Sequence, residues 1–201
     1  MGCDGRKIVR NIENPIDNLI IDLCTAINRR LSPKWVSPNI LTTFSLITGV
    51  LSAWFIYKDL FLHSGIFYFL SYLFDCLDGN FARMYNQVTK FGDIYDHMTD
   101  RIKMVLVIIA ILTNKVISHR VKVIFMVVFF IFFAFLVYHM SCQEMNVKSG
   151  KSMFLGMYRG ICGCKNYISI TKFFGCGTFN LVIFGFIMYF YVAYKKMMVK
   201  N

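Results

Sequence analysis

Five aspartates lie between Phe74 and Arg101, and their spacing could place most of them on facing sides of two helices. They are Asp75, Asp78, Asp93, Asp96 and Asp100. Asp75 and Asp78 are three residues apart and Asp96 and Asp100 are four apart, so each pair would share a helix face. If a short turn joins the two helices, the end of the first meets the start of the second. Four carboxylates then converge at one place.

Four like charges in a partly dry site repel one another, and bound cations remove that repulsion. Ligand sets made only of oxygen favour hard ions, Mg²⁺ or Mn²⁺, over zinc. The chain shows no group of histidines and cysteines typical of a zinc site. His97 follows Asp96 but points about 100° further around a helix, so we interpret it as a packing residue or a neighbour of the ligands.

Arg83 and the small residues Gly79, Ala82 and Gly92 accompany the aspartates and suggest a phosphate pocket, because small side chains let a ligand or a helix approach closely. Two metal ions that clamp a diphosphate stabilise both oxygens of an in-line displacement. A carboxylate left partly free could accept the proton of an attacking hydroxyl. The alternative is a set of solvated helix ends, but the flanking apolar runs favour a functional site.

The composition indicates a membrane protein. The 201 residues are 57% hydrophobic and 16% charged, with a mean hydropathy of +0.54, whereas soluble domains are about 25% charged. The formal net charge is +11, and the basic residues stand mostly between apolar runs, as expected beside anionic lipid headgroups. We therefore expect membrane lipids as partners and no nucleic acid.

Hydropathy predicts an all-α integral membrane bundle of about six transmembrane helices, five of them clear and the sixth weak. The clear spans cover 40–57, 60–74, 91–113, 123–140 and 175–194. The weak one, within 152–171, contains Arg159 and Lys165. The first half of the span 91–113 is too polar for lipid, so it must face the bundle interior or a watery cavity.

Residues 1–39 are predicted to form an amphipathic interfacial segment that precedes the transmembrane domain, 40–201. Apolar residues recur there at helical spacing, which is typical of a helix on the membrane surface. They are Ile16, Leu19, Ile20, Leu23 and Ile27. The seven cysteines are odd in number and show no framework spacing, so we expect them to be reduced.

The aspartates belong to a longer pattern. The chain carries D-x-x-D-G-x-x-A-R from Asp75 to Arg83 and, eight residues later, G-x-x-x-D-x-x-x-D from Gly92 to Asp100. This pattern resembles the signature of the CDP-alcohol phosphatidyltransferases, with all eight fixed positions filled. The sequence PNILT at 38–42 resembles the usual entry to the first helix of that family, so the similarity covers about 38–113.

The resemblance implies a bundle of six helices, usually dimeric, with two Mg²⁺ or Mn²⁺ ions per active site at the cytosolic side. It implies transfer of a phosphatidyl or phospho-alcohol group from a CDP-linked donor to an alcohol, with release of CMP. By position, Asp75, Asp78 and Asp96 would bind the metals. Asp100 would bind the second metal and act as the general base. The donor would be contacted by Gly79, Arg83 and Thr89, helped by Asn39 and Thr42.

The length and local motifs resemble the branch that uses CDP-diacylglycerol. The runs NQVT at 86–89 and TDR at 99–101 look most like phosphatidylinositol synthases, although NQxT also occurs in phosphatidylglycerophosphate synthases. We expect myo-inositol as the acceptor. Glycerol 3-phosphate, serine, or CDP-choline or CDP-ethanolamine with diacylglycerol remain alternatives. Arg159 and Lys165 could bind the acceptor or anchor lipid headgroups. In a eukaryote the expected membrane is the endoplasmic reticulum.

Two other functions fit an aspartate-rich membrane bundle less well. Membrane prenyltransferases also hold a diphosphate with Mg²⁺, but they are longer chains that carry DxxxD motifs on two separated helices. A transport bundle could use the aspartates as cation sites. Asp100 argues against a protein that only binds lipid, because binding alone does not need a base.

Overall fold

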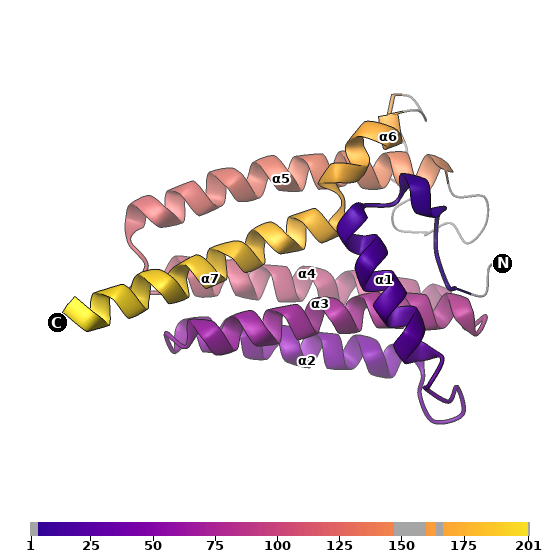
Figure 1. Cartoon of the computed structure of the whole chain (residues 1–201), viewed down its shortest axis with the longest axis horizontal. Helices are drawn as coiled ribbons and strands as arrows, with labels where there is room; N and C mark the ends of the chain where they lie inside the picture. The colour runs from indigo at the N-terminus through magenta and orange to yellow at the C-terminus, as the bar shows by residue number, and fades with distance from the viewer. Residues whose placement is uncertain (1–3, 147–159, 164–166, 201) are drawn as a thin grey trace.

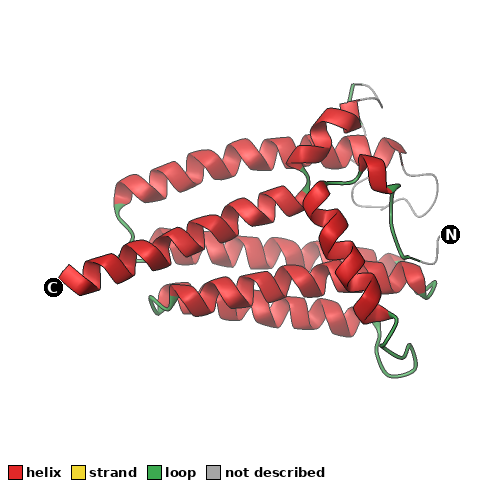
Figure 2. Ribbon diagram, in the orientation of Figure 1, coloured by secondary structure: helices red, strands yellow, loops and turns green. Residues whose placement is uncertain are grey.

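The computed structural model describes residues 4–146, 160–163 and 167–200, and every regular element in them is helical (Figures 1 and 2). Five helices have at least 20 residues: α2 (Pro38–Tyr57), α3 (Phe61–Met84), α4 (Lys90–Thr113), α5 (His119–Asn146) and α7 (Cys176–Lys200). The shorter elements are η1 (Arg10–Ile12), α1 (Pro15–Asn28), α6 (Ile168–Thr171) and η4 (Lys172–Phe174). The prediction of an all-α protein is confirmed.

Helices α3 and α4 both pack closely against α2, and the short turns between successive helices make them run in alternating directions. Small polar residues line the contact between α2 and α3. The Ser45 hydroxyl donates to the Ser71 carbonyl at 2.9 Å, and the Ser52 hydroxyl donates to the Ser64 carbonyl at 3.0 Å. Small residues at helix interfaces let the backbones approach in a membrane. The turn between α3 and α4 uses Asn86 with a φ of 54°, which asparagine tolerates well.

Helices α5 and α7 pack against each other through aromatic side chains, and α7 packs against α3. Phe125 and Phe186 meet edge to face with ring centroids 5.2 Å apart, and Phe129 lies 5.5 Å from Phe179. Phe61 of α3 is 1% exposed and contacts Phe190 of α7 at 5.9 Å. These rings and aliphatic side chains such as Ile56, Ile111 and Ile187 form the apolar core away from the aspartates. Rings of this size exclude water and fix the spacing of the helices.

The helices suit a membrane. Within the described residues, three segments are long and apolar enough to cross one: Pro38–Tyr57, His119–Asn146 and Ile168–Val199. Helices α3 and α4 have 24 residues each, but they carry the aspartates. Large apolar side chains face outward, among them Phe130 at 61% and Ile124 at 55% exposure. The protein therefore presents an apolar outer surface, and polar groups gather inside it.

Helix α1 crosses the end of the bundle (Figure 1). Its buried face combines polar residues, including Asp17 and Asn28, with Ile21 and Cys24. Asp17 is 7% exposed and accepts hydrogen bonds from Tyr72 and from the Gly177 amide. Leu19 and Leu23, by contrast, are 69% and 45% exposed. Leu19 and Leu23 of the predicted apolar stripe thus face away from the bundle, whereas Ile20 and Ile27 of the same stripe pack against its core. The division at residues 39 and 40 stays a prediction.

The described residues differ from the sequence predictions in one cysteine pair and in the region of the weak sixth span. The prediction of reduced cysteines is wrong for one pair, because Cys142 and Cys162 form a disulfide across a separation of 20 residues. This pair shows no framework spacing, so no pattern along the chain indicated it. The weak sixth span is not seen in the described part of 152–171, where Ile168–Thr171 is a four-residue helix. The remainder of that range lies mostly outside the described residues.

Candidate active site

Three helix ends meet where the aspartates lie. The start of α2, the last turns of α3 and the first turns of α4 share one end of the bundle (Figure 1). Side-chain caps fix two of these ends. The Ser37 hydroxyl accepts a hydrogen bond from the Ile40 amide, and the Thr89 hydroxyl accepts one from the Gly92 amide at 3.0 Å. Such caps satisfy amides that a helix start leaves open.

One half of the cluster is held by a lysine. Lys103 Nζ lies 3.0 Å from Asp75 Oδ1 and 2.7 Å from Asp100 Oδ1, and it donates to Ser45 Oγ at 2.6 Å. Lys103 is only 9% exposed. The ammonium group therefore joins a carboxylate of α3 to one of α4 and hydrogen-bonds α2 as well. Charge-assisted hydrogen bonds of this kind are about twice as strong as neutral ones.

The other half of the cluster forms no close ion pair among the described residues, although the Arg83 guanidinium is near enough to attract Asp78 and Asp96 electrostatically. Asp78 is 3% exposed and accepts a hydrogen bond from the Thr42 hydroxyl at 2.5 Å. Asp96 Oδ1 is buried and has no hydrogen-bond partner within the described residues. A buried carboxylate oxygen without a partner is costly. This half of the cluster is therefore the part that most needs a bound cation.

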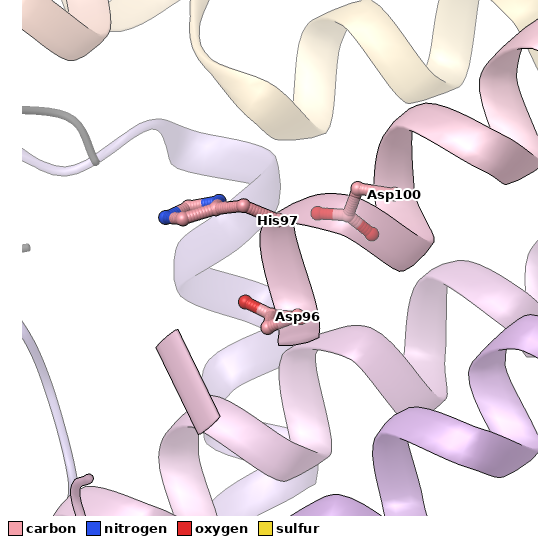
Figure 3. Close-up of side chains that lie close together, drawn as sticks. All are labelled: Asp96, His97 and Asp100. Atoms are coloured by element: carbon pink, nitrogen blue, oxygen red, sulfur yellow. The ribbon is translucent and has the colours of Figure 1, made fainter. Parts of the chain in front are cut away.

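The aspartates of α4 lie with a histidine in a group that suits a metal ion (Figure 3). Ligand atoms of Asp96, His97 and Asp100 all lie within 4.8 Å of one another. Small side-chain rotations would bring oxygens to the ~2.1 Å that Mg²⁺ requires. His97 Nε2 also lies 3.5 Å from Asp93 Oδ1. The acidic donors fit a hard divalent ion, and His97 lies nearer to them than its position on the helix suggested.

The residues predicted to contact the donor form two small groups. A Cβ on Gly79 would lie 3.1 Å from the Arg83 guanidinium, so the glycine lets Arg83 lie along α3. A Cβ on Gly92 would lie 3.0 Å from Thr89 Oγ1 and 3.4 Å from Asn39 Oδ1. The structure thus brings Asn39, Thr89 and Gly92 together. Ala82 contributes its carbonyl, which accepts from the Gln87 amide at 2.8 Å and closes the turn.

The N-terminal segment reaches the same end of the bundle. Arg83 Nε donates to the Gly5 carbonyl at 2.7 Å, and the Asn80 amide donates to the Asp4 carbonyl at 2.8 Å. Glu13, which precedes α1, is 5% exposed, and this burial raises its pKa to about 7. The segment before α1 is therefore part of the site's surroundings rather than a loose tail.

A cavity of about 220 Å³ opens beside Asp75, Asp100 and Lys103, between α3, α4, α5 and α7. Its polar end also includes His97 and Arg101. Its other end is apolar and is formed by side chains of α5 and α7, including Phe133, Leu136, Phe179 and Ile183. The cavity therefore joins the carboxylates to a space that could hold a second molecule.

The residues on which the acceptor prediction rests are only partly placed. Thr99 is 2% exposed and donates to the Asp96 carbonyl at 2.8 Å, whereas Arg101 is exposed at the mouth of the cavity. Arg159 and Lys165 lie outside the described residues. Their predicted acceptor contacts stay predictions.

Comparison with known proteins agrees with this arrangement. A profile of the CDP-alcohol phosphatidyltransferases matches residues 35–198, which is more than half of the chain. The chain belongs to the CDP-alcohol phosphatidyltransferase family. The predicted resemblance is thereby confirmed. Phospholipid synthesis is the setting that this family implies.

Individual relatives match over shorter stretches. A CDP-diacylglycerol–inositol 3-phosphatidyltransferase of Drosophila melanogaster is 36% identical over 64 residues, which cover 32% of this chain and 28% of the relative. The Saccharomyces cerevisiae protein of the same name is 41% identical over 70 residues (33% and 30%). A CDP-diacylglycerol–glycerol-3-phosphate 3-phosphatidyltransferase of Aquifex aeolicus is 37% identical over 65 residues (32% and 36%). The matches thus span about a third of these relatives' length. No solved structure matches the chain.

The sequence pattern missed Lys103, Ser45 and Gly49 as parts of the site. Lys103 is three residues after Asp100, so their shared helix face was visible in the sequence. No pattern pointed to Ser45 and Gly49, because their closeness to Lys103 depends on how α2 packs against α4. The metal-ligand and donor-contact roles of the signature residues remain proposals, which are developed below.

Proposed function

We propose that this protein transfers a phosphatidyl group from CDP-diacylglycerol to a small polar alcohol, myo-inositol, and releases CMP. The convergence of Asp75, Asp78, Asp96 and Asp100 from α3 and α4 carries the proposal, because this family's signature residues form one site only in that arrangement. Asp75 and Asp100 share one lysine, and the ligand atoms of Asp96 and Asp100 lie within 4.8 Å.

Each residue has a role that its surroundings support. Asp75, Asp78 and Asp96 are the proposed ligands of the divalent ions, Mg²⁺ or Mn²⁺, with Asp100 on the second ion. When bound, such ions neutralise the diphosphate of the donor and stabilise the leaving CMP. Asp100 borders the cavity and would accept the proton of the acceptor's hydroxyl as that oxygen attacks phosphorus.

The proposed donor site lies on the other side of the carboxylates. Arg83, held close to α3 by Gly79, would pair with a phosphate of the donor. Asn39, Thr42 and Thr89 would hold the remainder of the nucleotide. Thr42 has a second duty here, because its hydroxyl orients Asp78. The donor and the acceptor would thus approach Asp100 from different sides.

The acceptor proposal draws on two named relatives that act on inositol, at 36% and 41% identity. The relative named for glycerol 3-phosphate, at 37%, keeps that alcohol as the second candidate. Family membership argues against a prenyltransferase or a transport bundle. We also propose a homodimer with its active site at the cytosolic face, an interfacial α1, and the endoplasmic reticulum as the membrane of a eukaryotic host.

The proposal can be tested with the purified full chain in detergent. Radiolabelled CDP-diacylglycerol and Mn²⁺ or Mg²⁺ are supplied with inositol, glycerol 3-phosphate, serine or diacylglycerol. We expect CMP and a new lipid only with inositol. Product with glycerol 3-phosphate alone would move the proposal to the second candidate. No CMP release with any alcohol, from protein that binds the metal, would refute it.

Asp100→Asn isolates the proposed base. We expect it to lower turnover by at least about a hundredfold, the scale of lost general base catalysis, while donor binding changes little. Donor binding can be followed by equilibrium dialysis with labelled CDP-diacylglycerol. Full activity of Asp100→Asn would show that another group takes the proton.

A further inference from the structure

We propose that Lys103 is a tethered cation that occupies one of the two metal positions, so that the chain binds one divalent ion tightly and a second only weakly. The proposal rests on the proposed function, because it concerns the same four carboxylates. It assigns a role to a residue outside the signature and sets how the site responds to metal concentration.

The ammonium group lies between the two carboxylates that a second ion would need. Lys103 Nζ is 3.0 Å from Asp75 Oδ1 and 2.7 Å from Asp100 Oδ1. A third partner, Ser45 Oγ, lies 2.6 Å away on α2. Three partners match the three donors of an ammonium group, so the charge is fully satisfied in this position.

The fold is shaped to admit this side chain. A Cβ on Gly49 would lie 2.6 Å from Lys103 Cγ and 2.7 Å from its Cδ, distances that carbon atoms do not tolerate. Only glycine at position 49 lets the aliphatic stem pass along α2. The same Cβ would lie 3.0 Å from Ser71 Oγ, and the Ser71 hydroxyl donates to the Ser45 carbonyl at 2.8 Å. Side chains of three helices therefore build the place that Lys103 fills.

A divalent ion and this ammonium group exclude each other. An ion held by Asp75 and Asp100 would lie about 2.0–2.2 Å from an oxygen of each, in the space that Nζ now takes. Two cations that close repel strongly in a site with little water. No ammonium or guanidinium group forms an ion pair with Asp78 or Asp96 within the described residues; Arg83 attracts both only from a greater distance, and Asp96 Oδ1 lacks a hydrogen-bond partner there. The first ion therefore has an open place, and the second must displace Lys103.

Metal binding measures this competition directly. Mn²⁺ is titrated into purified full-length protein in detergent, and free Mn²⁺ is read by electron paramagnetic resonance. For the unchanged protein we expect one tight ion per chain. For Lys103→Met, which keeps the length and removes the charge, we expect two tight ions, with at least a tenfold gain in affinity for the second.

Lys122→Met serves as the matched control. Lys122 Nζ donates to the backbone carbonyls of Leu112 and Asn114, at the end of α4 away from the aspartates. Its loss removes the same charge without touching the site, so binding should equal that of the unchanged protein. Ser45→Ala removes one of the three partners of Nζ and should give a smaller, several-fold gain. This second variant keeps the test decisive if Lys103→Met does not fold.

Three outcomes would overturn the proposal. The first is two ions of similar affinity in the unchanged protein. The second is a folded Lys103→Met that binds as the unchanged protein does, or the same result from Ser45→Ala where Lys103→Met does not fold. Either result, combined with normal CMP release, would leave the proposed function standing. The third is no Mn²⁺ binding in any variant, which would remove the metal site and the proposed function with it.

Discussion

The hydrogen bond from Thr42 to Asp78 offers a sharp test of the open half of the cluster. Thr42→Val keeps the shape of the side chain and removes the hydroxyl that donates to Asp78 Oδ2 at 2.5 Å. Asp78 is 3% exposed, so water cannot easily replace the lost donor. The carboxylate then loses both its orientation and a partner for its charge.

The expected size follows from the kind of bond. A hydrogen bond to a charged group contributes about 1.5–3 kcal/mol, and each tenfold change in a binding constant corresponds to about 1.36 kcal/mol. We therefore expect Thr42→Val to weaken the first Mn²⁺ by about tenfold to a hundredfold. Groups that orient metal ligands typically have effects of about this size. Thr42→Ser keeps the hydroxyl and should restore most of the affinity.

Thr48→Val is the matched control for this experiment. Thr48 lies on the same helix, is 8% exposed, and its hydroxyl donates to the Phe44 carbonyl of its own helix at 2.8 Å. The assay is Mn²⁺ titration by electron paramagnetic resonance, with circular dichroism to verify helix content. If Thr42→Val and Thr48→Val bind Mn²⁺ equally well, Asp78 is not oriented by Thr42 or is not a ligand, and the reasoning fails.

Two further predictions concern the donor site and the N-terminal segment. Gly92→Ala would place a methyl group 3.0 Å from Thr89 Oγ1, so we expect a severalfold higher KM for CDP-diacylglycerol at nearly constant kcat. The control is Gly185→Ala, whose methyl group would meet nothing within 4 Å and which should match the unchanged protein. An unchanged KM in Gly92→Ala would contradict the placement of Gly92 in the donor site. Burial raises the pKa of Glu13 from 4.5 to about 7, so the folded state holds its proton more tightly and stability should fall as pH rises between those values. Glu13→Gln should remove this slope and stabilise the protein by roughly 3 kcal/mol above pH 7, which thermal unfolding in detergent across pH can check; a slope that persists would refute the assignment.

Much of the fold could be predicted because its signals are local. Apolar runs located the five long helices to within a few residues at most ends, although α3 extends ten residues beyond the predicted end at Phe74, through the aspartates to Met84. A span predicted from hydropathy ends at the first charged residue, whereas the hydrogen bonding of the helix continues past it. The spacing of Asp75, Asp78, Asp96 and Asp100 predicted which helix faces carry them. The short turn between α3 and α4 predicted that the two faces meet at one end of the bundle.

The interior of α1 could not be predicted in the same way. The apolar residues at helical spacing predicted a helix on the membrane surface, with its apolar face toward lipid. In the structure Asp17 and Asn28 are buried, with Asn28 donating to the Leu77 carbonyl at 3.0 Å, while Leu19 is exposed. The face that docks on the bundle is therefore mixed, because it combines Asp17 and Asn28 with the buried apolar residues Ile21 and Cys24. Hydrogen bonds to particular partners on α3 and α7 then determine which face of α1 packs inward. The sequence of α1 does not reveal those partners.

The same limit explains why the carboxylates were foreseen and the cation between them was not. A lysine three residues after an aspartate on one helix is usually a surface ion pair, which contributes little. Here position 49 is a glycine, so no Cβ blocks the Lys103 side chain. Ser45 supplies the third partner of the Lys103 ammonium group. Both belong to α2, more than fifty residues earlier in the chain. The packing of α2 against α4 decides whether Lys103 points inward. The signature residues of α3 and α4 therefore reveal the carboxylates, but they do not reveal that Lys103 neutralises two of them.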